Sequence, residues 1–141
     1  MTDTIAAREA ELIEEFEVFD NWLDRYQYLI DLGRELPEFP ESERLDSDKG
    51  SGCQSQVWLQ AHADGNRVVF SAISDAAIVS GLIAVLMRLY SDAPARDIAN
   101  DPASFGSALG LDNHLSPSRA NGLYAKLERI RGLAQSVSDA A

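Results

Sequence analysis

With 141 residues, 45% of them hydrophobic, the chain is long enough to bury a core without metal or disulfide support, and we expect a single domain over residues 1–141. Its one cysteine excludes an internal disulfide, a CxxC redox pair and a metal or iron–sulfur site built of cysteines alone. The formal charge of -11 disfavours direct binding to nucleic acid or to an anionic membrane, because both partners require clusters of lysine and arginine.

The negative charge is concentrated in the first third of the chain. Residues 1–48 contain 15 acidic residues and four arginines, whereas residues 49–141 contain eight residues of each sign. This acidic third is either a solvated face or a docking surface for a basic partner. The first residues also lack the continuous apolar segment of a signal peptide, so we expect a cytoplasmic protein.

Two helices are predicted before the first proline. Apolar residues recur at helical spacing through residues 4–19, and Asp20-Asn21 offers an N-cap for a second helix that ends near Leu36-Pro37. One stripe of this second helix consists of Trp22, Tyr26, Leu29, Ile30 and Gly33, and we expect it to face the core. Residues 37–49 are poor in apolar side chains and are predicted to form a loop.

A β-hairpin is predicted in the middle of the chain. Polar and apolar residues alternate over residues 57–62 and again over residues 67–73. Asp64-Gly65-Asn66 lies between the two runs and is a strong turn signal, so the two strands should pair antiparallel.

The segment after the hairpin is apolar on nearly all sides. Residues 76–90 therefore predict a central buried helix, which is too short to span a bilayer. Ser74 or Asp75 can serve as its N-cap. Gly81 within the helix would permit another element to approach closely.

The last third of the chain predicts further helices. Pro94 and Pro102 each suit the first position of a short helix, and Gly110 suits a C-cap. A final helix should begin at Ser116-Pro117, and the tail from Gln135 onward is expected to fray. The buried face of this helix is predicted to carry Leu123, Leu127, Ile130 and Ala134, and its exposed side Lys126, Arg129 and Arg131. Helices packed on a small antiparallel sheet of about three strands define an α+β fold.

The surroundings of Cys53 make it the first candidate for chemistry. Gly50 and Gly52 let the backbone turn sharply before the thiol, and a predicted strand follows it, so the cysteine would lie on a loop held by a rigid element. A free cysteine is most often a small buried hydrophobic residue, but the polar residues Gln54, Ser55 and Gln56 after it favour a functional thiol.

Other chemical motifs are sparse. His62 and His114 are the only histidines and have no zinc-ligand spacing, although a cysteine–histidine pair could still form in the fold. The sequence has no glycine-rich phosphate loop before a helix and no GxSxG motif. Nucleotide-binding and hydrolase functions therefore have little support.

Three segments, taken together in their order and spacing, resemble the SufE family of sulfur acceptors. They are Gly52-Cys53-Gln54-Ser55-Gln56-Val57-Trp58, Ser74-Asp75-Ala76-Ala77-Ile78-Val79 with Gly81-Leu82-Ile83-Ala84, and His114-Leu115-Ser116-Pro117-Ser118-Arg119. The resemblance extends from about Trp22 to the region of Arg131 and is weak in the first helix, in residues 38–49 and in residues 100–110. It implies the α+β fold that this family shares with iron–sulfur scaffold proteins of the IscU type.

The resemblance implies a persulfide relay. A cysteine desulfurase of the SufS or CsdA type, which carries the pyridoxal phosphate (PLP), would transfer sulfur to Cys53 and be stimulated by this chain. The sulfur would then pass to a downstream acceptor such as an iron–sulfur assembly scaffold. No cofactor or metal of the chain's own is expected, and calling it an enzyme is partly convention because the partner liberates the sulfur. A single cysteine suits such a carrier, since a second nearby thiol could attack the persulfide and release the sulfur as sulfide.

The resemblance also suggests roles around Cys53. Arg119 is the candidate cation for the thiolate, the persulfide or the partner, with an ordinary surface or ion-paired arginine as the alternative. Asp75 would cap its helix and help to hold the cysteine loop, which Gln54, Ser55 and Gln56 would support through hydrogen bonds or partner contacts. His114 is expected to be structural, with proton transfer as the alternative.

Two other functions remain open at the level of sequence. A thiol-dependent redox enzyme, such as a peroxidase, is disfavoured because the chain has no resolving cysteine. A non-catalytic adaptor would activate a desulfurase by docking alone.

Overall fold

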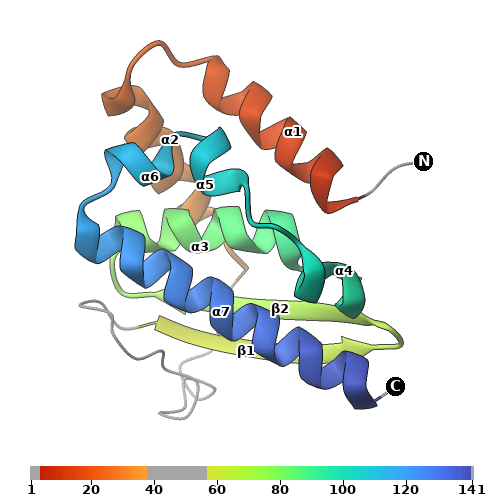
Figure 1. Cartoon of the computed structure of the whole chain (residues 1–141). Helices are drawn as coiled ribbons and strands as arrows, with labels where there is room; N and C mark the ends of the chain where they lie inside the picture. Colours follow the sequence, from red (N-terminus) through yellow and green to blue (C-terminus); the bar gives the residue numbers. More distant parts are fainter. Residues whose placement is uncertain (1–3, 38–56, 141) are drawn as a thin grey trace.

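The computed structural model describes residues 4–37 and 57–140 (Figure 1). The helices are α1 (Ile5–Glu17), α2 (Trp22–Arg34), α3 (Ala77–Tyr90), α4 (Ala95–Asn100), α5 (Phe105–Ala108), α6 (Leu111–His114) and α7 (Pro117–Ala140). The strands are β1 (Val57–Asp64), β2 (Arg67–Ser74) and β3 (Ala93–Pro94). These residues form an α+β fold with a three-stranded antiparallel sheet, as the sequence predicts.

The sheet is a hairpin extended by a short third strand. β1 and β2 pair in register from Val57 opposite Ser74 to Asp64 opposite Arg67, which leaves the two-residue turn Gly65-Asn66. Gly65 has a φ of 63°, the left-handed conformation that glycine adopts without steric penalty. β3 pairs only with the start of β2, so the strand order is β1-β2-β3.

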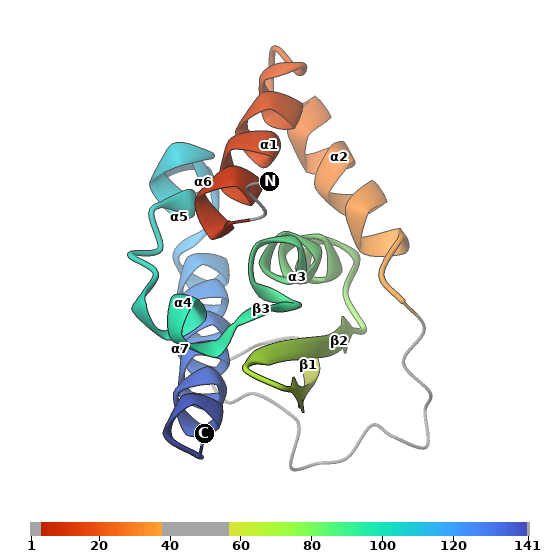
Figure 2. The same ribbon diagram turned by 90° about the vertical axis from the view of Figure 1, so that its right-hand side faces the viewer.

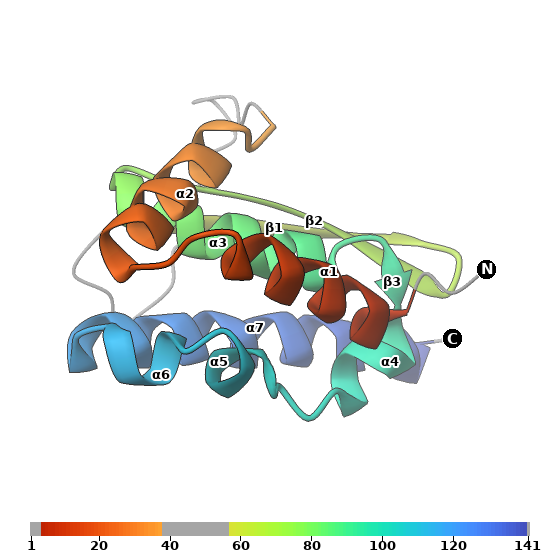
Figure 3. The same cartoon turned by 90° about the horizontal axis from the view of Figure 1, so that it is seen from above.

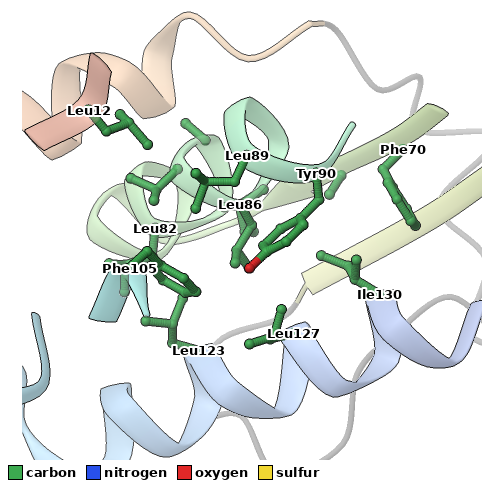
Figure 4. Packing of buried hydrophobic residues seen from close by; sticks show 14 of the residues in the cluster. Leu12, Phe70, Leu82, Leu86, Leu89, Tyr90, Phe105, Leu123, Leu127 and Ile130 are labelled. Carbon is green, nitrogen blue, oxygen red and sulfur yellow. The ribbon is translucent and has the colours of Figure 1, made fainter. Parts of the chain in front are cut away.

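Helix α3 lies at the centre of the molecule. Figure 2, which views this helix end on, shows it between the α1–α2 pair and the hairpin, with α7 beside it. Side chains from all these elements converge around α3 (Figure 4). The fully buried ones include Leu12, Leu29, Ile83, Leu86, Leu89, Tyr90, Phe105, Leu123, Leu127 and Ile130. The apolar run in residues 76–90 therefore does form the predicted buried helix.

Side chains cap α1 and, as predicted, α2, but none caps α3. Thr4 Oγ1 accepts from Ala7 N at 3.1 Å, and Asn21 Oδ1 accepts from Asp24 N at 2.9 Å. The N-cap of α3 is Ala76, whose methyl group cannot accept a hydrogen bond. The prediction that Asp75 caps this helix is therefore wrong, because the strand continues through Ser74 and the helix begins one residue later than expected.

The segment between α3 and α7 holds three short helices where the sequence predicts two. Pro94 precedes α4 as its N-cap, but Pro102 begins no helix, since α5 starts only at Phe105. Gly110, with a φ of 76°, follows α5 and leads directly into α6. The predicted fraying of the C-terminal tail is also wrong, because α7 continues to Ala140.

The buried face of α7 is as predicted, with one addition. Leu123, Leu127, Ile130 and Ala134 are all buried. Of the three basic residues predicted to be exposed, Lys126 is only 8% exposed, and Arg129 and Arg131 are partly buried. Lys126 lies three residues after Leu123 and four before Ile130, so helical geometry turns it to the same side.

Helices α2 and α3 cross with their backbones in close contact. A Cβ at Gly81 would lie 2.2 Å from the carbonyl oxygen of Leu29, and one at Gly33 would lie 2.6 Å from the backbone nitrogen of Gly81. Neither neighbour is the end of a flexible side chain, so a methyl group fits at neither position unless the helices separate. The close approach predicted at Gly81 is confirmed.

Replacing Gly81→Ala should destabilise the fold by about 3 kcal/mol or more, because the clash outweighs the helix propensity that alanine adds. Thermal and urea unfolding measure the change. Gly132→Ala in α7 is the matched control: its Cβ would meet nothing within 4 Å. This control should gain about 0.5–1 kcal/mol. Equal stability changes in the two variants would contradict the packing.

A partly buried cluster of polar side chains joins α1 and α2 to α3. Arg88 donates to both carboxylate oxygens of Glu15, at 2.5 and 2.6 Å, and the hydroxyl of Tyr28 donates to the same carboxylate. The hydrogen bonds from Arg88 hold the pKa of Glu15 below its usual value, against the opposing effect of burial. Burial and the Glu15 carboxylate raise the pKa of Tyr28 to about 12.

The depressed pKa of Glu15 predicts a pH-dependent contribution to stability. A carboxyl group of this kind stabilises the fold above its unfolded-state pKa of 4.5 and loses that contribution as the pH falls through the folded-state value. Glu15→Gln should therefore lower the melting temperature at pH 7. The gap to the wild type should narrow steadily below pH 4.5. Melting curves across this range test the prediction, and a gap that is independent of pH would contradict it.

Candidate functional site

The end of the molecule where β1 begins carries the predicted site residues that the structure describes. Val57 opens β1 and pairs with Ser74, the last residue of β2, next to the turn into α3. The first turns of α3 and α7 and the short helix α6 lie at this same end (Figures 1 and 3). Cys53, Gly50, Gly52, Gln54, Ser55 and Gln56 lie outside the described residues.

The turn from β2 into α3 is fixed by serine side chains. Ser74 Oγ accepts from the backbone N–H of Ala76 at 3.2 Å, and the hydroxyl of Ser80 donates to the carbonyl of Ser74 at 3.2 Å. Asp75, between these groups, is exposed. The turn therefore presents Asp75 to the solvent from a well-anchored backbone, although not as the cap of α3.

Arg119 lies in the first turn of α7. Ser116 caps this helix, since its Oγ accepts from the backbone N–H of Arg119 at 3.3 Å and its carbonyl accepts from Ala120 N at 2.9 Å. The side chain of Arg119 is exposed, and its guanidinium has no hydrogen-bond or ion-pair partner within residues 4–37 and 57–140. A cation held in this way on a rigid backbone is available to an anionic group or to a partner.

His114 packs against α2 in the way expected of a structural residue. Its ring stacks on Trp22 with centroids 4.0 Å apart and planes 13° apart, and the hydroxyl of Tyr26 donates to its carbonyl. Its Nδ1 lies 2.9 Å from the carbonyl of Gly110. Because a carbonyl only accepts, this nitrogen carries the proton. These contacts hold the ring of His114 against α2 in one orientation.

A second polar contact holds α6 against α7. The hydroxyl of Tyr124 donates to Asp112 at 2.5 Å, and burial together with this carboxylate raises the pKa of Tyr124 to about 12. Tyr124 also lies against Gly106 of α5, where a Cβ would meet its hydroxyl at 2.0 Å. Asp112 and Tyr124 flank the start of α7 in the chain, so this contact helps to orient the turn that carries Arg119.

One lysine that the sequence predicts on the exposed side of α7 is instead buried in the structure. Lys126 is buried beside Val57 and Leu59 at the beginning of β1, and its ammonium group donates to the carbonyl of Gly122 at 3.2 Å. The signal that could have identified it is its spacing from Leu123 and Ile130, which outweighs its charge in deciding its side of the helix.

Residues 4–37 and 57–140 contain neither a metal-binding cluster nor a membrane-spanning helix. No three His, Cys, Asp or Glu side chains among these residues gather where they could hold a metal ion. None of the helices formed by them combines the length and apolar character needed to cross a bilayer.

The same fold occurs in a solved structure. The solution structure of a hypothetical protein from Thermus thermophilus has a TM-score of 0.77 to this chain and covers 94% of it and 96% of its own length. The two sequences are 21% identical, so this likeness shows the fold alone.

Sequence relatives define the family. An uncharacterised SufE-like protein of Rhizobium meliloti (strain 1021) is 42% identical over 130 residues, which are 89% of this chain and 93% of that protein. A second uncharacterised SufE-like protein, from Rhizobium etli, is 43% identical over 126 residues, 86% and 85% of the two chains. The SufE family, described as an Fe-S metabolism associated domain, matches residues 10–134.

The helix-covered hairpin and the family match together place the chain among proteins that contain the domain described as Fe-S metabolism associated. The chain is a member of the SufE family. Membership links it in general to sulfur transfer and to cysteine desulfurases.

Proposed function

We propose that this chain accepts sulfur as a persulfide on Cys53 from a PLP-dependent cysteine desulfurase, stimulates that enzyme and delivers the sulfur to iron–sulfur cluster assembly. The observation that carries the proposal is the family match, which runs through residues 10–134 and so includes the only cysteine of the chain. The chain itself needs one thiol and no cofactor, because the pyridoxal phosphate works in the desulfurase.

The transfer step resembles thiol–disulfide exchange. The Cys53 thiolate attacks the terminal sulfur of the desulfurase persulfide, a new sulfur–sulfur bond forms, and the desulfurase cysteine leaves as a thiolate. One sulfur–sulfur bond replaces another, so no outside oxidant or reductant is required. An unperturbed cysteine has a pKa of about 8.5 and is mostly protonated at neutral pH, and a nearby cation raises the reactive fraction.

The described end of the molecule supports this chemistry. Cys53 precedes Val57 by four residues, and four residues of chain span at most about 14 Å. The first turn of α7, which bears Arg119, is at the same end of the fold (Figure 3).

Arg119→Ala should slow sulfur transfer about tenfold or more, as expected when a cation that favours the thiolate or contacts the partner is lost. The fold should be unaffected, because the guanidinium is exposed and has no partner among the described residues. Single-turnover transfer at saturating protein measures the first effect and thermal melting the second. Arg119→Lys, which keeps the charge, should recover part of the rate. Unchanged transfer in Arg119→Ala would remove this residue from the mechanism.

The role of Cys53 is tested by Cys53→Ser in a coupled assay. Alanine release by the desulfurase, followed with and without the chain, reports stimulation under multiple turnover. We expect the variant to bind the desulfurase but to lose nearly all stimulation, because the persulfide has no acceptor. Full stimulation by Cys53→Ser would contradict the carrier function and establish a non-catalytic adaptor in its place.

A further inference from the structure

The short helix α6 is held by hydroxyl groups from two other helices. The hydroxyl of Tyr26 in α2 donates to the carbonyl of His114, the last residue of α6. The hydroxyl of Tyr124 in α7 donates to the carboxylate of Asp112 at 2.5 Å. Figures 1 and 3 show α6 beside the first turn of α7, at the end of the fold where α2 begins. A helix of four residues is thus tied to both of these longer helices.

Close packing also fixes the place of α6. The ring of Trp22 stacks on His114 and packs against the residue before α6, since a Cβ at Gly110 would lie 2.9 Å from Trp22 Cζ2. A Cβ at Gly106 in α5 would overlap both the hydroxyl of Tyr124 and the carboxylate of Asp112. The helix therefore has close neighbours in α2, α5 and α7, which leave it little room to shift.

The position of α6 determines where α7 begins. Only Leu115 and Ser116 separate the two helices. Leu115 is buried, and its backbone N–H donates to the carbonyl of Leu111 at 3.0 Å. Ser116 then caps α7 through the backbone N–H of Arg119. Because each residue of this connection is held, a displacement of α6 moves the first turn of α7 and Arg119 with it.

The hydrogen bonds of the two tyrosines lie near the surface. Asp112 and His114 are exposed, and Tyr26 and Tyr124 are half-buried. A hydrogen bond at the surface competes with water, so its net contribution to the stability of the whole fold is small. Contacts of this kind control how often one segment opens locally. Their main effect should therefore fall on the order of the first turn of α7.

We propose that Tyr26 and Tyr124 are positioning residues for sulfur transfer: through α6, their hydroxyl groups hold Arg119 in the orientation that transfer requires. This inference rests on the proposed function, in which Arg119 acts on the sulfur or on the desulfurase. Neither tyrosine has to touch the sulfur itself. A displacement of a reacting or binding group by about 1 Å is enough to lower a rate strongly.

Tyr26→Phe and Tyr124→Phe each remove one hydroxyl and keep the ring. Each variant should slow single-turnover sulfur transfer about fivefold, as expected for the loss of one hydrogen bond. Tyr28→Phe in α2 is the matched control, because its hydroxyl donates to Glu15 and not to α6. A tyrosine of α2 or α7 whose variant transfers sulfur at the wild-type rate has no positioning role.

The control should show the opposite pattern. Tyr28→Phe should transfer sulfur at the wild-type rate but lower the melting temperature more than Tyr26→Phe does. The hydrogen bond of Tyr28 is partly buried and has a charged acceptor, whereas that of Tyr26 is exposed and has a neutral one. Slowing of transfer in proportion to the loss of stability, across all three variants, would show a general effect on the fold and overturn the inference.

A double-mutant cycle tests whether Tyr26 acts through Arg119. Tyr26→Phe/Arg119→Ala should transfer sulfur at the same rate as Arg119→Ala alone, because no guanidinium is left to position. A further loss of about fivefold in the double variant would show that Tyr26 acts independently of Arg119. That result would overturn the inference.

Amide hydrogen exchange tests the positioning without the desulfurase. The backbone N–H groups of Arg119 and Ala120, which both donate to Ser116, should exchange about fivefold faster in Tyr26→Phe than in the wild type. The amides of the hairpin should keep their wild-type rates. Unchanged exchange at Arg119 and Ala120 would overturn the inference even if transfer were slowed.

The outcomes separate this inference from the proposed function. A wild-type chain that accepts sulfur, together with Tyr26→Phe and Tyr124→Phe variants that match its rate, would overturn the positioning role alone. A wild-type chain that accepts no sulfur would overturn the proposed function, and the role of the tyrosines in transfer with it.

Discussion

The contact between the backbones of α2 and α3 is the constraint on which the rest of this structure depends. Gly81 leaves room for the backbone of Leu29, and Gly33 leaves room for the backbone of Ser80 and Gly81. The two helices can approach this closely because both glycines lack a side chain. Because α3 is buried on its other sides by the hairpin and α7, its position fixes the whole core (Figures 2 and 4). The glycine contact then fixes the position of α2, whose buried face packs against α3.

The position of α2 in turn organises the end of the fold that bears the candidate site. Trp22 and Tyr26 reach from α2 to His114, and that contact sets where α7 begins. The turn with Arg119 and the start of β1 at Val57 thus lie at the same end of the fold although they are far apart in the sequence (Figures 1 and 3). The chemistry we propose requires one thiol near the end of the fold that bears Arg119. The arrangement of that end depends on packing between elements from most of the chain.

Much of this fold follows from sequence because its local signals agree with one another. A turn preference at Gly65 correctly predicts the hairpin. Hydrophobic patterns correctly predict the buried helix α3 and the buried face of α7. The charge of Lys126 predicts an exposed side chain, whereas its position on the helix places it on the buried face. Asp75 was misplaced as a cap because the exact residue at which a strand yields to a helix depends on the pairing of Ser74, which local preference does not determine.

The long-range polar contacts lay beyond sequence reasoning. Glu15 and Arg88 are 73 residues apart, and no spacing rule relates them. The stacking of His114 on Trp22 likewise appears only once α2 and α6 are packed. The candidate site depends on a different kind of signal. A lone thiol after two glycines indicates that Cys53 is a candidate for chemistry, but its link to a desulfurase follows only from the resemblance of three motifs to the SufE family. The family match over residues 10–134 confirms the family.

The most direct test of sulfur transfer is an intact-protein mass spectrum, recorded without reductant after incubation with an active cysteine desulfurase and cysteine, followed by peptide mapping. Persulfide transfer predicts one added sulfur atom on the peptide that contains Cys53, removable by reductant and absent from Cys53→Ser. A chain that shows no added sulfur, although the desulfurase is active and bound to it, would contradict the account.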